Sequence, residues 1–366
     1  MTNLRIPGPI PVPGPILEEM GRPMINHRGP EFRDILLRVT ERLGQVYATR
    51  GDVYVLSSSG TGAMEAAIVN TLSPGDRVLA VTGGAFGDRF ARIAEVFGAD
   101  VTVLRYPLGQ PADPDGVRDS LNSDPTVKAV LVTHNETSTG VANDLASIAS
   151  VVKGEFGKLL LVDGVSSVGS VPMFTDEWGC DVVASASQKG WMVPPGLAFI
   201  NFSADAWRAH AEASMPRYYF DAAEYKRYLE IGQPPWTPAI SVFFALDSAL
   251  GAMLDEGLSE VHARHARAAA RVRQGVADLG LSLLPHPDHA SDTITAVRVP
   301  EGINAAELLR VMRDEYDVVL AGGQQSLAGK IFRIGHLGMV SDEDIDGVFA
   351  ALGATLQKLR YSGESS

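Results

Sequence analysis

One lysine has an unusual setting, in the stretch S-Q-K-G-W-M-V-P-P-G at residues 187–196. Lys189 follows D-V-V-A-S-A, which has the composition of a buried strand, and an ammonium group is costly to bury. A lysine in such a place is typical of covalent catalysis, in which its amine condenses with a carbonyl group and exchanges the ammonium for an imine. The position of Lys189 after an apolar run therefore makes it a candidate for covalent attachment, to be read together with its partners.

A carboxylate ends another apolar run, L-L-L-V-D-G-V-S-S-V-G at residues 159–169. Asp163 needs a partner there if it is ionised, although taken alone it could simply cap the following turn. Taken with Lys189, the pair suits pyridoxal 5'-phosphate: the lysine forms a Schiff base with the aldehyde, and the carboxylate keeps the pyridine nitrogen protonated. The protonated ring can then accept electrons from the α-carbon of a substrate.

The stretch S-S-S-G-T-G-A-M-E at residues 57–65 follows an expected strand and opens an expected helix. Ser59 and Thr61 supply hydroxyls, Gly60 allows a close approach of the backbone, and a helix N-terminus favours an anion. A helix with an ordinary N-cap and no bound anion would explain the same residues. A dinucleotide fingerprint is disfavoured, because Glu65 stands where that motif has its third glycine. A P-loop is excluded, because no Gly-Lys-Ser/Thr follows.

The elements that must position these residues alternate in type between about residues 52 and 203. Short apolar runs separated by helical patterns indicate βαβ units, and runs without polar alternation are typical of strands covered on both faces. The expected fold is α/β, a mainly parallel sheet between helices. Ligands in such sheets bind beyond the carboxyl ends of the strands.

Three segments are expected along the chain. Residues 1–20 form an extended Pro/Gly-rich N-terminal arm that could lie across a neighbour or a cleft, and residues 21–255 form the large cofactor-binding α/β domain. A helical stretch from Thr237 to about Leu279, interrupted near Gly257, leads into a small α+β domain over residues 256–366.

The composition excludes several classes of protein. A net charge of −13 among 366 residues opposes binding to nucleic acid, and no apolar run approaches the length of a membrane span. One cysteine excludes an internal disulfide framework and a multi-cysteine zinc site, and no metal site is expected. A reducing cytoplasm is the expected location.

Several motifs in order along the chain resemble a known family. They are P-G-P near the N-terminus, N-H-R-G-P-E-F at 26–32, S-G-T-G-A-M-E, G-A-F-G-D-R-F at 84–90, T-H-N-E-T-S-T-G at 133–140, V-D-G-V-S-S-V-G, S-Q-K-G-W-M-V-P-P-G and F-R-I-G-H-L-G at 332–338. Over almost its whole length the chain resembles the class V, fold type I pyridoxal-phosphate aminotransferases, specifically the alanine–glyoxylate and serine–glyoxylate (serine–pyruvate) group.

The resemblance implies a role for each matching residue. Lys189 would carry the Schiff base and, once freed by the incoming amine, act as general base, with Asp163 as the partner of the pyridine nitrogen. The other positions would serve as follows: Phe86 stacks on the cofactor, Thr137 contacts its phenolic oxygen, Ser59, Gly60, Thr61 and Gln188 bind its phosphate, Arg333 binds the substrate carboxylate, and Thr237 reaches the phosphate site of a neighbouring subunit. A homodimer with shared active sites follows, and His27 and Arg28 receive no role.

The reaction that the resemblance implies is a transamination in two half-reactions. The expected substrates are a small amino acid, alanine or serine, and a small 2-oxo acid, glyoxylate or pyruvate, because one carboxylate-binding arginine is matched. An aspartate, aminophosphonate or aminosulfonate donor stays an alternative, and so does a non-enzymatic protein of the same fold. Cysteine desulfuration is disfavoured because the one cysteine, Cys180, precedes Lys189 and leads into a strand. The sequence does not identify the substrate pair.

Overall fold

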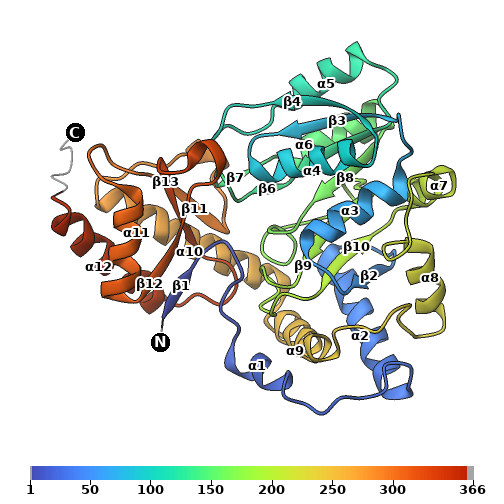
Figure 1. Cartoon of the computed structure of the whole chain (residues 1–366), viewed down its shortest axis with the longest axis horizontal. Helices are drawn as coiled ribbons and strands as arrows, with labels where there is room; N and C mark the ends of the chain where they lie inside the picture. The colour runs from blue at the N-terminus through green and yellow to red at the C-terminus, as the bar shows by residue number, and fades with distance from the viewer. Residues whose placement is uncertain (1, 361–366) are drawn as a thin grey trace.

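The computed structural model describes residues 2–360, so that residue 1 and residues 361–366, at the outer ends of the first and last expected segments, lie outside it. Two lobes are visible in Figure 1, each built on its own sheet. The larger contains a seven-stranded sheet and the smaller a four-stranded one.

The large sheet has the strand order β2-β10-β9-β8-β5-β3-β4. Its strands are β2 (Val53–Leu56), β3 (Arg77–Thr82), β4 (Asp100–Arg105), β5 (Ala129–Thr133), β8 (Leu159–Asp163), β9 (Val182–Ala186) and β10 (Ala198–Asn201). Only β10 runs antiparallel to its neighbours, β2 and β9, among these strands. The mainly parallel α/β sheet predicted from the apolar runs is confirmed.

Helices cover both faces of this sheet (Figure 1). They are α2 (Pro30–Tyr47), α3 (Gly60–Thr71), α4 (Ala85–Val96), α5 (Pro114–Ser123), α6 (Leu145–Ala149) with its π-helical continuation Ser150–Glu155, α7 (Ala204–Glu212), α8 (Ala222–Glu230) and α9 (Ile240–Glu256). Successive residues of β5 alternate between two hydrophobic cores, Val130 and Val132 in one and Ala129 and Leu131 in the other. Burial on both faces explains why these strands lack polar alternation.

The small lobe has the strand order β1-β12-β13-β11. Its elements are β1 (Asn3–Arg5), α10 (Leu258–Asp278), β11 (Ile294–Arg298), α11 (Ala305–Tyr316), β12 (Val318–Gly322), β13 (Ile331–Gly335) and α12 (Asp342–Lys358), with short 3₁₀ turns at Pro287–His289 and Gln325–Leu327. The antiparallel pair β6 (Asn135–Glu136) and β7 (Val141–Ala142) lies on the side of the large lobe that faces it (Figure 1).

Helices α9 and α10 connect the lobes and are separated by Gly257 alone. Gly257 has a φ of 87°, a conformation that L side chains rarely adopt, so a glycine permits the break at this point. The helical stretch predicted from Thr237 to Leu279, with its interruption, is confirmed.

The N-terminal arm joins both lobes. Residues Asn3–Arg5 pair in parallel with β12 of the small sheet, and the chain then crosses to helix α1 (Gly14–Glu19) beside α9 (Figure 1). The arm expected to be extended thus contains a strand and a short helix. The two boundaries between the three expected segments stay a prediction.

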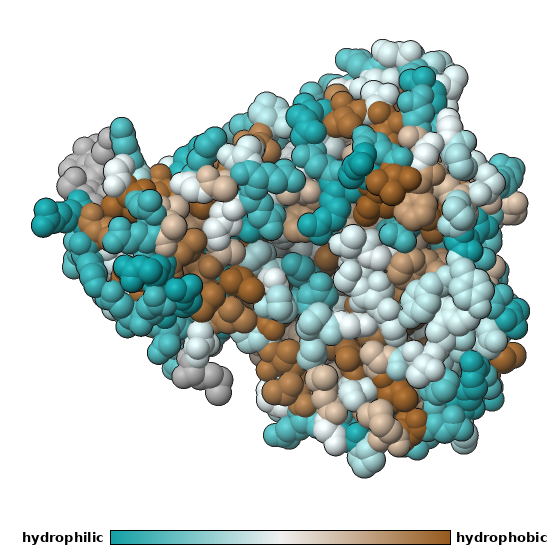
Figure 2. Space-filling view, in the orientation of Figure 1, coloured by the Kyte–Doolittle hydropathy of each residue, from teal (hydrophilic) through white to brown (hydrophobic). Residues whose placement is uncertain are grey.

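The outer surface is mixed in polarity. Figure 2 shows hydrophilic residues at the margins of this face and hydrophobic residues gathered along its lower edge, over the region of α1. Leu17 and Met24, in and just after α1, are 53% and 63% exposed. Within residues 2–360, no helix combines the length and hydrophobicity that a membrane crossing needs.

Candidate active site

Lys189 lies in the turn after β9 and is buried, with 9% of its surface exposed. Its Nζ donates a hydrogen bond of 2.5 Å to the carbonyl oxygen of Pro7 in the N-terminal arm. Burial lowers the pKa of Lys189 to about 8, Asp163 acts against this shift, and the positive charges of Arg333 and Arg89 add to it. An amine with a pKa near neutrality can act as a nucleophile or a base.

The arm packs directly on this lysine. A Cβ on Gly8 would lie 2.8 Å from both Cδ and Nζ of Lys189, and one on Gly335 of β13 would lie 2.1 Å from the carbonyl oxygen of Ile6. The backbone of Ile10 also donates to the carbonyl of Gln188 (3.3 Å). Residues 6–10 therefore form a strap between β13 of the small sheet and the lysine turn of the large sheet.

Asp163 is the last residue of β8, at the carboxyl edge of the large sheet, and is 4% exposed. Its Oδ1 accepts from the backbone N–H of Val165 (3.0 Å) and its Oδ2 from the hydroxyl of Thr133 (3.5 Å). Burial raises the pKa of Asp163 to about 6; the Val165 N–H opposes the rise, the Glu136 carboxylate adds to it, and Lys189 is among the charges that lower it. The carboxyl group is still mostly ionised at neutral pH.

The glycine-led start of α3 lies at the same edge of the sheet. A Cβ on Gly60 would lie 2.7 Å from Cγ2 of Val165, just after Asp163, so the helix begins as close to this turn as a backbone can. Ser59 is the N-cap but makes no side-chain capping bond. The exposed Arg89 donates to Thr61 Oγ1 (3.3 Å). Helix N–H groups, two exposed hydroxyls and a guanidinium therefore converge where an anion would be favoured.

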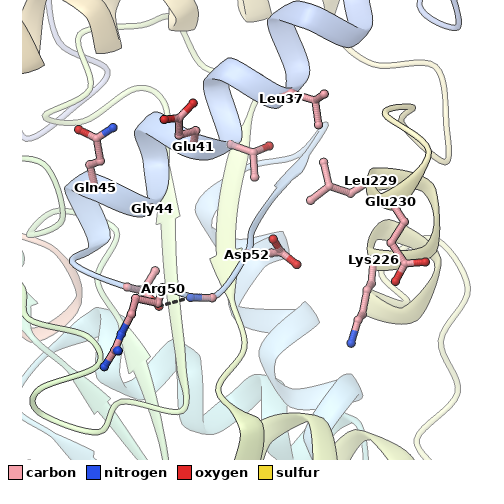
Figure 3. Close-up of a pocket in the computed structure, with 12 residues that line it drawn as sticks. Leu37, Glu41, Gly44, Gln45, Arg50, Asp52, Lys226, Leu229 and Glu230 are labelled. Carbon is pink, nitrogen blue, oxygen red and sulfur yellow. Dashed lines mark hydrogen bonds between the residues drawn. The ribbon is translucent and has the colours of Figure 1, made fainter.

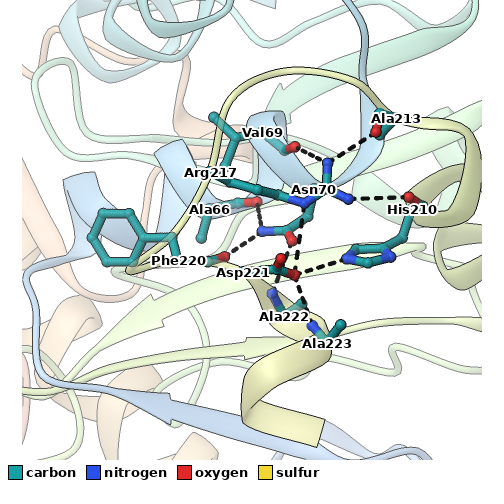
Figure 4. Close-up of polar contacts among 10 residues, drawn as sticks. All are labelled: Ala66, Val69, Asn70, His210, Ala213, Arg217, Phe220, Asp221, Ala222 and Ala223. Carbon is teal, nitrogen blue, oxygen red and sulfur yellow. Dashed lines mark hydrogen bonds and ion pairs between the residues drawn. The ribbon is translucent and has the colours of Figure 1, made fainter. Parts of the chain in front are cut away.

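The far side of α3 is anchored by a polar network (Figure 4). The Asn70 amide donates to the carbonyls of Ala66 (2.7 Å) and Phe220 (2.6 Å), and its oxygen accepts from the N–H of Ala222 (2.9 Å). Phe220 in turn reaches the first turn of α3, because a Cβ on Gly62 would lie 2.9 Å from its Cζ. The network fixes both α3 and the Phe220 side chain beside the start of the helix, where an anion would be favoured.

Gln188 adds a buried polar atom to this region. Its Oε1 is shielded from solvent, and among residues 2–360 no group forms a hydrogen bond with it. Buried amide groups normally have partners, so an unpaired one beside Lys189 is consistent with a ligand that completes it.

Phe86 lies in the first turn of α4 and is partly buried. The guanidinium carbon of Arg89 is 4.9 Å from the centre of its ring, and the Phe86 backbone N–H donates to Glu136 Oε2 (3.0 Å). The ring, Arg89 and Thr61 thus form one continuous contact between α4 and α3.

Arg333 comes from β13 of the small lobe and is 3% exposed. Its Nε and Nη2 donate to the carbonyl of Gly322 (3.0 and 2.8 Å) and its Nη1 to the carbonyl of Thr137 (3.0 Å). Burial lowers the pKa of Arg333, and the charge of Glu136 opposes that shift. A guanidinium carries five N–H groups, so the three contacts leave two that can bind a carboxylate.

Thr237 is exposed on the surface. Two residues further on, the N–H of Ala239 donates to Ser57 Oγ (3.1 Å), which places this segment beside the turn into α3. Arg28, for which the sequence suggests no role, donates to Gln233 (3.0 Å) and to the carbonyl of Pro235 (3.4 Å) and so supports the same segment.

The structure therefore brings nine of the ten predicted residues to one edge of the large sheet, with Thr237 at its outer margin. Three contributors were not predicted: Glu136, Arg89, and the carbonyl of Pro7. Glu136 and Arg89 do occur in the motifs T-H-N-E-T-S-T-G and G-A-F-G-D-R-F. However, nothing in the residues around a carboxylate in a polar run, or an arginine in a helical pattern, predicts that its side chain reaches the site.

Two other features lie outside this constellation. Cys180 is buried, and burial raises the pKa of its thiol to about 12, which is unfavourable for a nucleophile. A surface pocket of about 500 Å³ between α2 and α8, drawn in Figure 3, is lined by Glu41, Asp52 and Lys226 among others and includes none of the ten predicted residues.

The residues at the sheet edge fit pyridoxal phosphate. The set comprises a buried lysine with a lowered pKa, an ionised carboxylate on the adjacent strand, an uncapped helix N-terminus with a neighbouring guanidinium, and a partly buried aromatic ring. These are the groups that an aldehyde, a pyridine nitrogen, a phosphate and a flat ring each require.

Comparisons with known proteins agree with this chemistry. Residues 18–346 match the family described as aminotransferase class-V. The chain is 44% identical to "Soluble hydrogenase, small subunit" of Synechococcus sp. (98% of this chain, 94% of the relative) and 40% identical to L-aspartate–glyoxylate aminotransferase of Paracoccus denitrificans (92% and 86%). The crystal structure of alanine–glyoxylate aminotransferase from Nostoc sp. superposes with a TM-score of 0.93 at 31% identity, covering 97% of this chain and 95% of that one.

Proposed function

The chain belongs to the class V aminotransferase family, and we propose that it transfers the amino group of alanine or serine to glyoxylate or pyruvate. The observation that carries the proposal is the buried pair of Lys189 and Asp163 at the edge of the large sheet, with Arg333 facing it from the small lobe. A base, a carboxylate and a carboxylate-binding guanidinium are what transamination of an amino acid needs.

Membership of the family implies pyridoxal phosphate as the cofactor. When bound, it supplies an aldehyde that condenses with amines and a ring that withdraws electrons from the attached carbon. We propose that Ser59, Gly60, Thr61 and Gln188 hold its phosphate, that Phe86 stacks on its ring, that Thr137 contacts its phenolic oxygen and that Asp163 keeps its nitrogen protonated.

Lys189 is the proposed attachment point and general base. With a pKa of about 8, its amine is partly neutral near physiological pH and can take the proton from the α-carbon of the donor. The carbonyl of Pro7 supports this role, because it accepts from Nζ and so offers the free amine a fixed position.

Arg333 is the proposed site for the donor's α-carboxylate. Its contacts with Gly322 and Thr137 hold the guanidinium between the end of β12 and the residue after β6, and a rigid guanidinium binds a carboxylate in a two-pronged fashion. The strap over residues 6–10 lies on the same part of β13 and limits the space beside the lysine, which favours small side chains.

We also propose that the protein is a homodimer with shared active sites and that it acts in the cytoplasm. The exposed Thr237 and the exposed apolar residues around α1 in Figure 2 support a subunit contact, because apolar surface is a common feature of interfaces.

A second donor, aspartate, is favoured by one observation, the 40% identity to a relative named L-aspartate–glyoxylate aminotransferase. A side-chain carboxylate needs a second cation. Arg22 packs on the Phe244 ring at 4.3 Å and Arg28 binds the segment before Thr237, whereas Arg89 lies beside Thr61 and already belongs to the proposed phosphate site.

The hydrogenase subunit name of another relative does not alter the proposal for this chain. Thiolate-held iron centres need several cysteines, whereas the chain contains one, and it is buried.

A half-reaction screen tests the proposal. Purified protein loaded with pyridoxal phosphate should be yellow, and each amino acid added alone should bleach the colour in proportion to its use as a donor. We expect alanine and serine to bleach it fastest, whereas fastest bleaching by aspartate would support the second donor. Protein that cannot be loaded, or that no amino acid bleaches, would contradict transamination.

A further inference from the structure

Glu136 is a buried carboxylate that the proposed mechanism does not use. It is the second residue of β6, is 2% exposed, and burial raises its pKa despite four hydrogen bonds. A buried carboxylate is costly unless its oxygens are satisfied, and it persists where its contacts serve the structure around it.

Both oxygens of Glu136 are fully engaged. Oε2 accepts from the backbone N–H groups of Phe86 and Gly87, each at 3.0 Å, at the start of α4. Oε1 accepts from the N–H (3.1 Å) and the hydroxyl (2.5 Å) of Ser138, whose hydroxyl oxygen also accepts from Ala85 N–H (2.9 Å).

These contacts replace the usual cap of helix α4. Gly84 occupies the N-cap position and has no side chain to offer, so that β6 and the residues after it satisfy the first N–H groups of the helix. The fit is tight, because a Cβ on Gly84 would lie 2.6 Å from both Cγ and Cδ of Glu136 and 2.4 Å from Ser138 Oγ. A negative charge at this helix end is also favourable.

The same carboxylate adjoins two other parts of the site. Thr137 follows it directly in the chain, and the carbonyl of Thr137 accepts from Arg333 Nη1 (3.0 Å). The charge of Glu136 also acts on Asp163, whose pKa it raises, and on Arg333, whose positive form it favours.

We propose that Glu136 is a positioning residue that locks the start of α4, with Phe86, to the segment that carries Thr137, so that both residues meet the cofactor in one rigid arrangement. The inference rests on the proposed function, because Phe86 and Thr137 contact a cofactor only in a protein that binds pyridoxal phosphate. The oxygens of Glu136 are occupied by Phe86, Gly87 and Ser138, so Glu136 acts on the cofactor through Phe86 and Thr137.

The test compares full-length variants with the wild-type protein. Glu136→Gln keeps the size of the side chain but replaces one acceptor oxygen with an NH₂ group, so that either the N–H groups of Phe86 and Gly87 or the N–H of Ser138 loses its acceptor. We expect the dissociation constant for pyridoxal phosphate, measured by titration of the cofactor-free protein, to rise about tenfold, as for the loss of a charged hydrogen bond. The circular dichroism of the bound cofactor should change as well, and kcat should fall more than KM for the donor rises.

Two further variants keep the inference testable if Glu136→Gln does not fold. Gly84→Ala inserts a methyl group against Glu136 at a backbone conformation that alanine adopts easily, and Gly14→Ala is its control, because a Cβ there meets nothing within 4 Å. Ser138→Ala removes one bridge and keeps the charge. Gly84→Ala should weaken cofactor binding about tenfold and Ser138→Ala about threefold, with Gly14→Ala unchanged.

The outcomes separate the possible roles of Glu136. A variant that melts at a lower temperature but retains wild-type cofactor affinity and dichroism when folded would reduce Glu136 to a structural role and overturn the inference. Wild-type affinity in Gly84→Ala would overturn it too. Failure of the wild-type protein to bind pyridoxal phosphate would instead overturn the proposed function, so the two failures are distinguishable.

Discussion

At the residue scale, burial moves the pKa values of Lys189 and Asp163 toward each other, the lysine down to about 8 and the aspartate up to about 6. Opposed pKa shifts in adjacent ionisable groups are typical of functional sites. Each shift lowers the free energy of unfolding, which a purely structural pair would have no reason to do. Both shifts lead to measurable behaviour in the cofactor-free protein.

The lowered pKa of Lys189 predicts the pH dependence of cofactor capture. Only the neutral amine attacks an aldehyde, so the association rate of pyridoxal phosphate should rise through a midpoint near pH 8 rather than near the ordinary lysine value of 10.5. Stopped-flow absorbance over this range measures it. A rate that keeps rising beyond pH 10 would mean that the lysine is not perturbed.

The raised pKa of Asp163 predicts that the ionised carboxylate, which the reaction needs, lowers the free energy of unfolding. The folded protein binds the proton of Asp163 more tightly than the unfolded chain does, so its contribution to the free energy of unfolding is full below about pH 4 and is lost as the pH rises through about 6. At about 1.4 kcal/mol per pKa unit, the ionised group costs the cofactor-free protein about 3 kcal/mol at neutral pH.

Asp163→Asn should remove this cost. Relative to wild type, the cofactor-free variant should gain about 3 kcal/mol of unfolding free energy between about pH 4 and about pH 7, measured with urea. Its activity with cofactor should fall at least about a hundredfold, because an amide does not hold a proton on the ring nitrogen. Equal pH profiles for the two proteins would contradict the assignment.

At the element scale, the strap over residues 6–10 joins a strand of the small sheet to the lysine turn of the large one. Gly8 has a φ of 126°, and its lack of a side chain lets the strap lie against Lys189. The strap therefore depends on a residue without a Cβ at this position.

Gly8→Ala should disturb the lysine. Its methyl group would meet Cδ and Nζ of Lys189, so we expect kcat/KM to fall at least about tenfold while the fold is retained. Gly14→Ala in the same arm is the matched control, since its Cβ has open space. Wild-type kinetics in Gly8→Ala would show that the strap is free to move away during the reaction.

The sequence is informative about elements whose signal is local. The strands of the large sheet are apolar throughout because both of their faces are buried, and Lys189 and Asp163 are recognisable because each places a charge beside such a run. Strand β1 has three residues and is defined by its pairing with β12, more than 300 residues away along the chain, so no local pattern predicts it. Glu136 depends in the same way on the start of α4, some 50 residues earlier.

At the scale of the whole molecule, the proposed active site draws on both lobes, because Arg333 comes from β13 and Lys189 from the turn after β9. Thr237, exposed at the margin, is the residue proposed to complete the phosphate site of a second subunit. If the two subunits share their sites as proposed, activity requires the dimer.

Subunit complementation tests this sharing. Lys189→Ala and Thr237→Asp should each be inactive, the latter because a carboxylate would repel the cofactor phosphate of the neighbour. A mixed population of the two should recover about a quarter of wild-type activity, since half of the dimers would be hybrids with one intact site each. Mixing that restores no activity would indicate that each subunit uses its own Thr237, and full activity of Thr237→Asp alone would show that neither site uses it.

The most direct test of the account is the covalent attachment of pyridoxal phosphate to Lys189. The purified protein is incubated with the cofactor, reduced with borohydride, digested and analysed by mass spectrometry. We expect one reduced cofactor group on the peptide that contains Lys189 and no incorporation into this peptide in Lys189→Ala. A label on surface lysines alone, such as Lys226, or no label at all would contradict it.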